Sequence, residues 1–150
     1  MDEQFVAEIR ETVERRLIEL GHPLERLTDS EVREEFDRRP EEGPWLHYEV
    51  EVAGERCLYG VLPVAGDDDE VRRGQQGAEA DFVRLRGEGR LVVVNNVIVA
   101  PRGVLVTYLL AHEGVDQSDS DLEEAMSNFL ASVWDSATGR PLILPRQQGS

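Results

Sequence analysis

The sequence predicts an α+β fold, in which an antiparallel sheet packs against N-terminal and C-terminal amphipathic helices. Apolar residues recur at three- and four-residue spacing near both ends of the chain, which is typical of helices with one buried face. Between these ends, apolar residues alternate with polar ones or form short runs, which favours strands. The 150 residues are enough to bury one core, so we expect a single domain over 1–150.

The helical segments have recognisable boundaries. The first helix is expected over 2–20, and Gly21 stands where a left-handed residue would end it. Residues 28–31 have the spacing of a capping box and open a shorter helix that ends before Pro40. The strongest helical pattern lies over 121–134 and closes the fold.

The first pair of strands is expected to form a hairpin over 45–63. Residues 45–52 alternate between apolar and polar side chains, and 53–55 turns the chain. The polar face of the first strand, which carries His47, Glu49 and Glu51, is expected to be exposed to solvent.

Further strands are expected over 82–86, 90–100 and 104–111, and a turn at 101–103 joins the last two. Asn95-Asn96 interrupts the apolar run of the middle one. Because asparagine tolerates positive φ, this pair is expected to be either a bulge or a tight turn.

Two segments lack a pattern that would bury them. Residues 64–80 are rich in glycine and acidic side chains, so we expect a long mobile loop there. Residues 145–150 are expected to be a frayed tail.

The charge of the chain is strongly negative. It carries 31 acidic and 16 basic residues, for a net charge of −15, and every basic residue is an arginine. Because no basic patch stands out, we expect no binding to nucleic acid or to anionic membranes, and no apolar run is long enough to span a bilayer. The acidity has three explanations that stay open: solubility, adaptation to high salt, and attraction of a basic partner.

Residues with reactive side chains are few. The absence of lysine excludes Schiff-base chemistry, and the single cysteine, Cys57, excludes an internal disulfide and suits a cytoplasmic location. His47, Glu49 and Glu51 share a strand face, but same-face neighbours about 6.6 Å apart do not converge on one metal ion. We therefore expect no catalytic residues, no metal site and no cofactor.

Apolar residues are more informative than reactive ones. The strand over 104–111 and the helix over 121–134 carry more apolar surface than a small domain is expected to need. One face should therefore contact a second copy or a partner. The residues expected on that face are Leu105, Tyr108, Leu110, Met126, Phe129 and Trp134.

The C-terminal part of the chain resembles a known group of proteins. A strand pair that begins at Asn95-Asn96, the step Gly114-Val115 and the amphipathic helix from Leu122 are similar to the pattern of the YbjN-like proteins and the type III secretion chaperones. The N-terminal helix and the low pI are also similar to that group. The resemblance implies a homodimer without enzymatic activity, whose apolar surface holds an extended segment of another protein.

We therefore expect a non-enzymatic, chaperone-like or regulatory module that binds a partner protein, and its negative charge would attract basic partners. Two other classes stay open. An acidic inhibitor or immunity-type protein would capture one basic enzyme tightly and in a salt-sensitive way. A small metal-assisted hydrolase would use His47 and His112 and would hold one stoichiometric transition metal.

Overall fold

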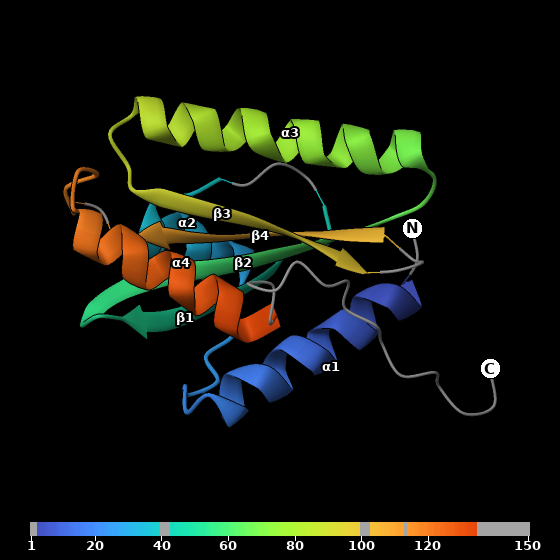
Figure 1. Ribbon diagram of the computed structural model, residues 1–150, viewed down its shortest axis with the longest axis horizontal. Helices are drawn as coiled ribbons and strands as arrows, with labels where there is room; N and C mark the ends of the chain where they lie inside the picture. The colour runs from blue at the N-terminus through green and yellow to red at the C-terminus, as the bar shows by residue number, and fades with distance from the viewer. Residues whose placement is uncertain (1–2, 40–42, 100–102, 113, 135–150) are drawn as a thin grey trace.

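The computed structural model describes residues 3–39, 43–99, 103–112 and 114–134, and it confirms the α+β fold. Two helices precede a hairpin, a long helix leads to a second pair of strands, and a helix follows them (Figure 1). The elements are α1 (Glu3–Glu19), α2 (Asp29–Phe36), β1 (Leu46–Val52), β2 (Glu55–Ala65), α3 (Asp68–Gly87), β3 (Val92–Val99), β4 (Gly103–Ala111) and α4 (Ser120–Trp134).

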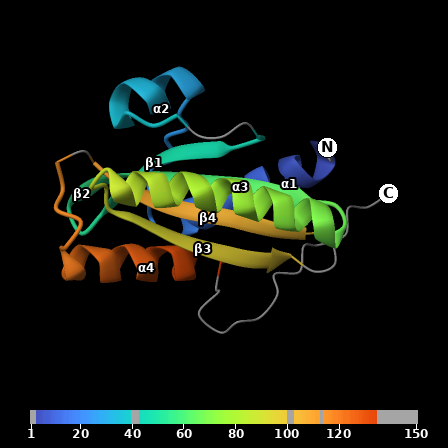
Figure 2. The same cartoon turned by 90° about the horizontal axis from the view of Figure 1, so that it is seen from above.

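The sheet has the strand order β1-β2-β4-β3, and all neighbouring strands are antiparallel. Strands β2 and β3 therefore run in the same direction with β4 between them, and α3 makes the connection across one face. Figure 2 shows the two edges of the sheet, with β3 at one and β1 at the other. This topology leaves β1 and β3 as the only strands, among the described residues, that lack a second neighbouring strand.

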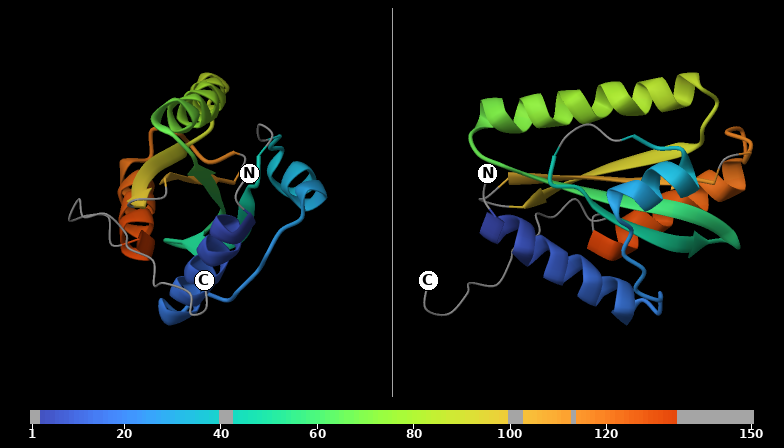
Figure 3. Two further views of the ribbon diagram at one scale, coloured as in Figure 1. Left: turned by 90° about the vertical axis from the view of Figure 1, so that its right-hand side faces the viewer. Right: turned by 180° about the vertical axis from the view of Figure 1, so that it is seen from behind.

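Helices cover both faces of the sheet, so the molecule has two apolar cores. Helices α1 and α4 pack on one face, and α2 and α3 pack on the other (Figure 3). In α1 the buried positions are four residues apart, at Phe5, Ile9, Val13 and Leu17, which is the spacing that keeps side chains on one helical face. The larger core lies between this stripe, the sheet and α4.

The capping features expected at the first two helices are present. Gly21 has a φ of 84°, a left-handed conformation that favours glycine. At the start of α2, the Thr28 hydroxyl accepts a hydrogen bond from the Glu31 amide at 3.2 Å, and the Glu31 carboxylate accepts one from the Thr28 amide at 3.1 Å. This reciprocal pair is a capping box, and it confirms the predicted helix start.

The prediction of a mobile loop over 64–80 is wrong, and so is the prediction of a strand over 82–86. Most of this segment belongs to α3, the longest helix. The Asp67 carboxylate accepts a hydrogen bond from the Glu70 amide at 2.8 Å and so caps the helix. Its apolar stripe is short, and packing of Phe82 and Leu85 on the sheet supplies the stability that the polar sequence lacks.

The hairpin over 45–63 is confirmed. Ala53 and Gly54 both have positive φ, 51° and 81°, as a two-residue hairpin turn requires. Asn95 and Asn96 form neither a bulge nor a turn, because they pair in regular register with Thr107 and Val106 of β4. The turn expected at 101–103 lies largely outside the described residues, and the tail at 145–150 lies wholly outside them.

None of the described helices is both long and apolar enough to cross a membrane.

Candidate functional site

The six residues predicted to form a binding face do not form one. Met126, Phe129, Trp134 and Leu105 belong to the core beneath α1 and α4, whereas Tyr108 and Leu110 belong to the core beneath α2 and α3. All six are buried, and the most exposed of them, Phe129, retains only 8% of its accessible surface. The predicted single exposed face is therefore corrected: the apolar side chains of β4 and α4 are covered by two helical layers of the same chain.

The two histidines proposed for a hydrolase lie in different surroundings. His47 Nε2 lies 2.8 Å from the hydroxyl of Tyr108, whereas His112 lies beyond the end of β4, with its ring against Phe36. No group of three or more His, Cys, Asp or Glu side chains among the described residues could hold a metal ion. The hydrolase reading therefore receives no support from the geometry.

His47 is buried, contrary to the prediction of a solvent-exposed strand face. Its ring stacks on Trp45 with a centroid distance of 5.6 Å and an interplanar angle of 16°. Burial, together with the positive charge of Arg38, lowers the pKa of His47 from 6.5 to about 3. The side chain is therefore neutral over the physiological range. Glu51, on the same strand, is exposed as expected.

A second buried polar group, Arg38, lies beside His47 and was not predicted from the sequence. Its side chain is fully buried, and its guanidinium forms an ion pair with Asp81 of α3. Its Nε donates to the Tyr108 hydroxyl at 3.4 Å, and its Cζ lies 5.0 Å from the centroid of the Tyr108 ring. No sequence signal distinguishes Arg38 from the neighbouring arginines, because its burial depends on tertiary contacts with Asp81 of α3 and Tyr108 of β4.

Cys57 is a buried core residue, as its apolar neighbours indicate. Burial, with a smaller contribution from Glu55, raises the pKa of its thiol to about 12. A thiol with so high a pKa is a poor nucleophile at neutral pH.

One edge of the sheet, the outer edge of β1, is covered by a segment from the same chain. The amide of Leu27 donates to the carbonyl of His47 at 2.9 Å, and the amide of Glu49 donates to the carbonyl of Glu25 at 3.0 Å. Arg26 forms a bridge with Tyr48 at the same place. Segment 25–27 therefore occupies two of the main-chain groups of β1 that face away from β2, the carbonyl of His47 and the amide of Glu49.

The other edge of the sheet is open in the described part of the chain: no described segment pairs with the outer side of β3. The amide of Ala111 donates to the carbonyl of Leu91, at 2.9 Å, and this contact fixes which groups point outward. In an antiparallel pair, hydrogen-bonded residues alternate with non-bonded ones. The odd-numbered residues of β3 therefore bond to β4, and the main-chain groups of Val92, Val94, Asn96 and Ile98 point outward.

The composition of β3 is unusual for an exposed edge. Edge strands commonly carry charged residues or proline that prevent further pairing, but β3 reads Val-Val-Val-Asn-Asn-Val-Ile-Val. The Ile98 side chain is 58% exposed. Helix α4, which packs beside β3, carries Asp121, Glu123 and Glu124 and no basic residue. The open edge is thus uncharged and, apart from its two asparagines, apolar, with an acidic helix next to it.

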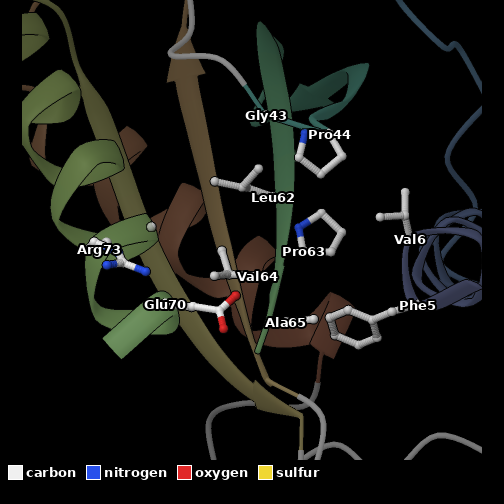
Figure 4. Close-up of a pocket in the computed structure, with 11 residues that line it drawn as sticks. Phe5, Val6, Gly43, Pro44, Leu62, Pro63, Val64, Ala65, Glu70 and Arg73 are labelled. Carbon is white, nitrogen blue, oxygen red and sulfur yellow. The ribbon is translucent and has the colours of Figure 1, made fainter. Parts of the chain in front are cut away.

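A cavity of about 370 Å³ lies at the end of the β1–β2 hairpin that is opposite its turn (Figure 4). Strand β2 continues past the start of β1, and its residues Leu62 to Ala65 form the middle of the cavity wall. Phe5 of α1 lines one side, and Glu70 and Arg73 of α3 line the other. The described part of the wall combines apolar groups with one charge of each sign, so it does not specify one ligand chemistry.

Comparison of the chain with protein-family models, with curated proteins and with solved structures finds no match.

Proposed function

We propose that this protein is a non-enzymatic binding module that holds an extended segment of a partner protein as an added strand along β3. The observation that carries the proposal is the row of outward main-chain groups at Val92, Val94, Asn96 and Ile98. The main chain of an added strand would form hydrogen bonds with these donors and acceptors, whatever the side chains of that strand. Its alternate side chains would contact Val94 and Ile98 on the α3 side of the sheet.

The charge of the molecule supports a basic partner. The acidic residues of α4 flank β3, and the whole chain carries −15, so arginine or lysine in the added segment would be attracted and steered to the edge. The homodimer expected from the sequence would use the same edge. Two copies at −15 repel each other, which favours a basic segment over a second copy at low ionic strength.

The proposal keeps two further expectations from the sequence. One is the resemblance of the sequence to the YbjN-like proteins and the type III secretion chaperones, which implies a surface that holds an extended segment of another protein. A cytoplasmic location is supported by the single thiol, Cys57, which suits a reducing compartment.

The test uses a synthetic peptide of eight residues that alternates valine and arginine, with a valine–glutamate peptide as control. We expect the basic peptide to bind, the acidic one to fail, and the affinity to fall as salt is raised. Hydrogen exchange should then slow at the amides of Val92, Val94, Asn96 and Ile98. Binding without this protection would contradict the proposed edge.

A matched pair of variants separates edge pairing from charge alone. Asn96→Pro removes one outward amide and leaves the hydrogen bonds between β3 and β4 in place. The affinity for the basic peptide should fall by about tenfold or more, because the proline ring also obstructs the added strand. Asn96→Ser keeps the amide and should bind like the natural chain. Equal affinity of the two variants would refute strand addition, and analytical ultracentrifugation of both would show whether a second copy occupies the edge instead.

A further inference from the structure

We propose that the flank of α3 around Asp81 is a binding site for a phosphate group. A cavity of about 360 Å³ opens there, lined by Arg39, Gly77, Ala80, Asp81 and Arg84. The site is separate from β3 and does not depend on the proposed strand addition.

The charge balance at this cavity is the reverse of that of the whole chain. Asp81 is the only carboxylate among the described residues that line it, and its two oxygens are each engaged by a different guanidinium, that of Arg38 and that of Arg84. Arg39 adds a third positive charge at the wall. With Arg39 and Arg84 in the wall and Arg38 behind it, the described residues set three positive charges against one carboxylate, an excess of two in a protein of net charge −15.

The buried member of the group strengthens this excess. Arg38 is fully buried, and its Nη2 has no hydrogen-bond partner among the described residues. It neutralises Asp81 from the protein side, so that Arg84 and Arg39 are left to attract an anion from the solvent side. Because the region behind the cavity is shielded from water, the charge of Arg38 is less screened there than at the surface.

The shape and the charge indicate the class of ligand. Gly77 and Ala80 are small, so a group can come close to the helix between Arg39 and Arg84. The planar fork of a guanidinium matches phosphate and carboxylate oxygens. A phosphate monoester carries about −1.5 to −2 at neutral pH, which matches an excess of two positive charges better than the single charge of a carboxylate does.

The probes are inorganic phosphate, N-acetyl phosphoserine amide and acetate, each titrated calorimetrically at one fixed ionic strength. Fixed ionic strength matters because added salt alone screens the repulsion within so acidic a chain. We expect both phosphate probes to bind one to one and acetate to bind at least tenfold more weakly. Tighter binding of the phosphoserine compound assigns the site to a monoester, and equal binding assigns it to free phosphate.

Three variants decide whether the cavity is the site. Arg84→Gln should lower the affinity for phosphate by about tenfold or more, because one charge-assisted contact is lost. Ala80→Leu keeps every charge but fills the cavity, and it should lower the affinity for phosphate as much as Arg84→Gln does. Arg72→Gln removes an exposed arginine of the same helix that pairs with Asp69 and should have no effect. Equal losses in Arg72→Gln and Arg84→Gln, or no detectable phosphate binding by the natural chain, would overturn the proposal.

Discussion

The imidazole of His47 and the hydroxyl of Tyr108 meet across an intervening strand, with Nε2 and the oxygen 2.8 Å apart. His47 pairs with Gly60 on β2, and Gly60 pairs with Tyr108 on β4. The Tyr108 hydroxyl also accepts a hydrogen bond from Arg38. Because a guanidinium can only donate, the Tyr108 hydroxyl keeps its own proton available, and it can donate to Nε2 of a neutral His47 in the tautomer that carries its proton on Nδ1.

The neutral state of His47 predicts how stability depends on pH. Its pKa is lowered to about 3 in the folded protein, so between pH 6.5 and 3 the unfolded chain binds a proton that the folded chain does not. Stability should therefore fall as the pH drops below about 6.5, by up to about 1.4 kcal/mol per pH unit from this group.

The measurement compares the free energy of unfolding in urea at pH 6.5 and pH 5 for the natural chain and for His47→Gln. The variant should lose this part of the slope, whereas His22→Gln should keep it. An unchanged slope in His47→Gln would show that the histidine is not held neutral by the fold.

Gly60 makes the contact between His47 and Tyr108 possible. A Cβ atom at this position would lie 2.6 Å from Cζ of Tyr108, so Gly60→Ala must displace the tyrosine ring. We expect a loss of roughly 2–3 kcal/mol in the free energy of unfolding, as for overpacked cores. Gly87→Ala is the control: no atom of the described residues lies within 4 Å of its added Cβ, and it should be neutral or stabilising by up to about 1 kcal/mol. Denaturant titration of both variants tests the difference.

The ion pair between Arg38 and Asp81 should be essential for the stability of the fold, because the Arg38 side chain is buried. Asp81→Asn leaves a buried guanidinium without its counter-charge and should cost about 3 kcal/mol or more. Adding Arg38→Met to this variant removes the uncompensated charge and should restore much of the stability. If thermal melts show no recovery in the double variant, the cost of Asp81→Asn lies elsewhere in α3.

The two asparagines of β3 should respond oppositely to proline. The amide of Asn95 points to β4 and that of Asn96 points outward, as the contact between Ala111 and Leu91 requires. Asn95→Pro should therefore cost about 3 kcal/mol or more, because it breaks the ladder, whereas Asn96→Pro should cost clearly less. Circular dichroism melts of the two variants test which main-chain groups of β3 point outward. A lower melting temperature for Asn96→Pro than for Asn95→Pro would exclude the assignment.

Local sequence patterns were sufficient for much of the fold. The apolar stripe of α1, the capping box at Thr28 and the alternation that ends at Ala53-Gly54 each depend on neighbours in the chain, and each is present in the structure. Helix α3 was missed because its stability comes from a short stripe around Phe82 that packs on the sheet. Charge and glycine content outweighed that stripe in the sequence.

The candidate sites depended on tertiary placement and were harder to predict. Tyr108 and Met126 are apolar in pattern, but nothing in the sequence shows that two layers of helices cover both faces of the sheet and bury them. Arg38 and Asp81 are separated by 43 positions in the chain, so their pairing has no local signature. The open edge at β3 became visible only with the strand order.

The two edges of the sheet differ, because the described part of the chain pairs with β1 and leaves β3 open, and this difference limits how further strands can be added. Segment 25–27 pairs with the middle of β1, so β3 is the sheet edge that the described residues leave open along its whole length. If two copies paired through β3, each would use this edge, and further edge-to-edge addition of copies would then have to start from a β1 that is already partly paired.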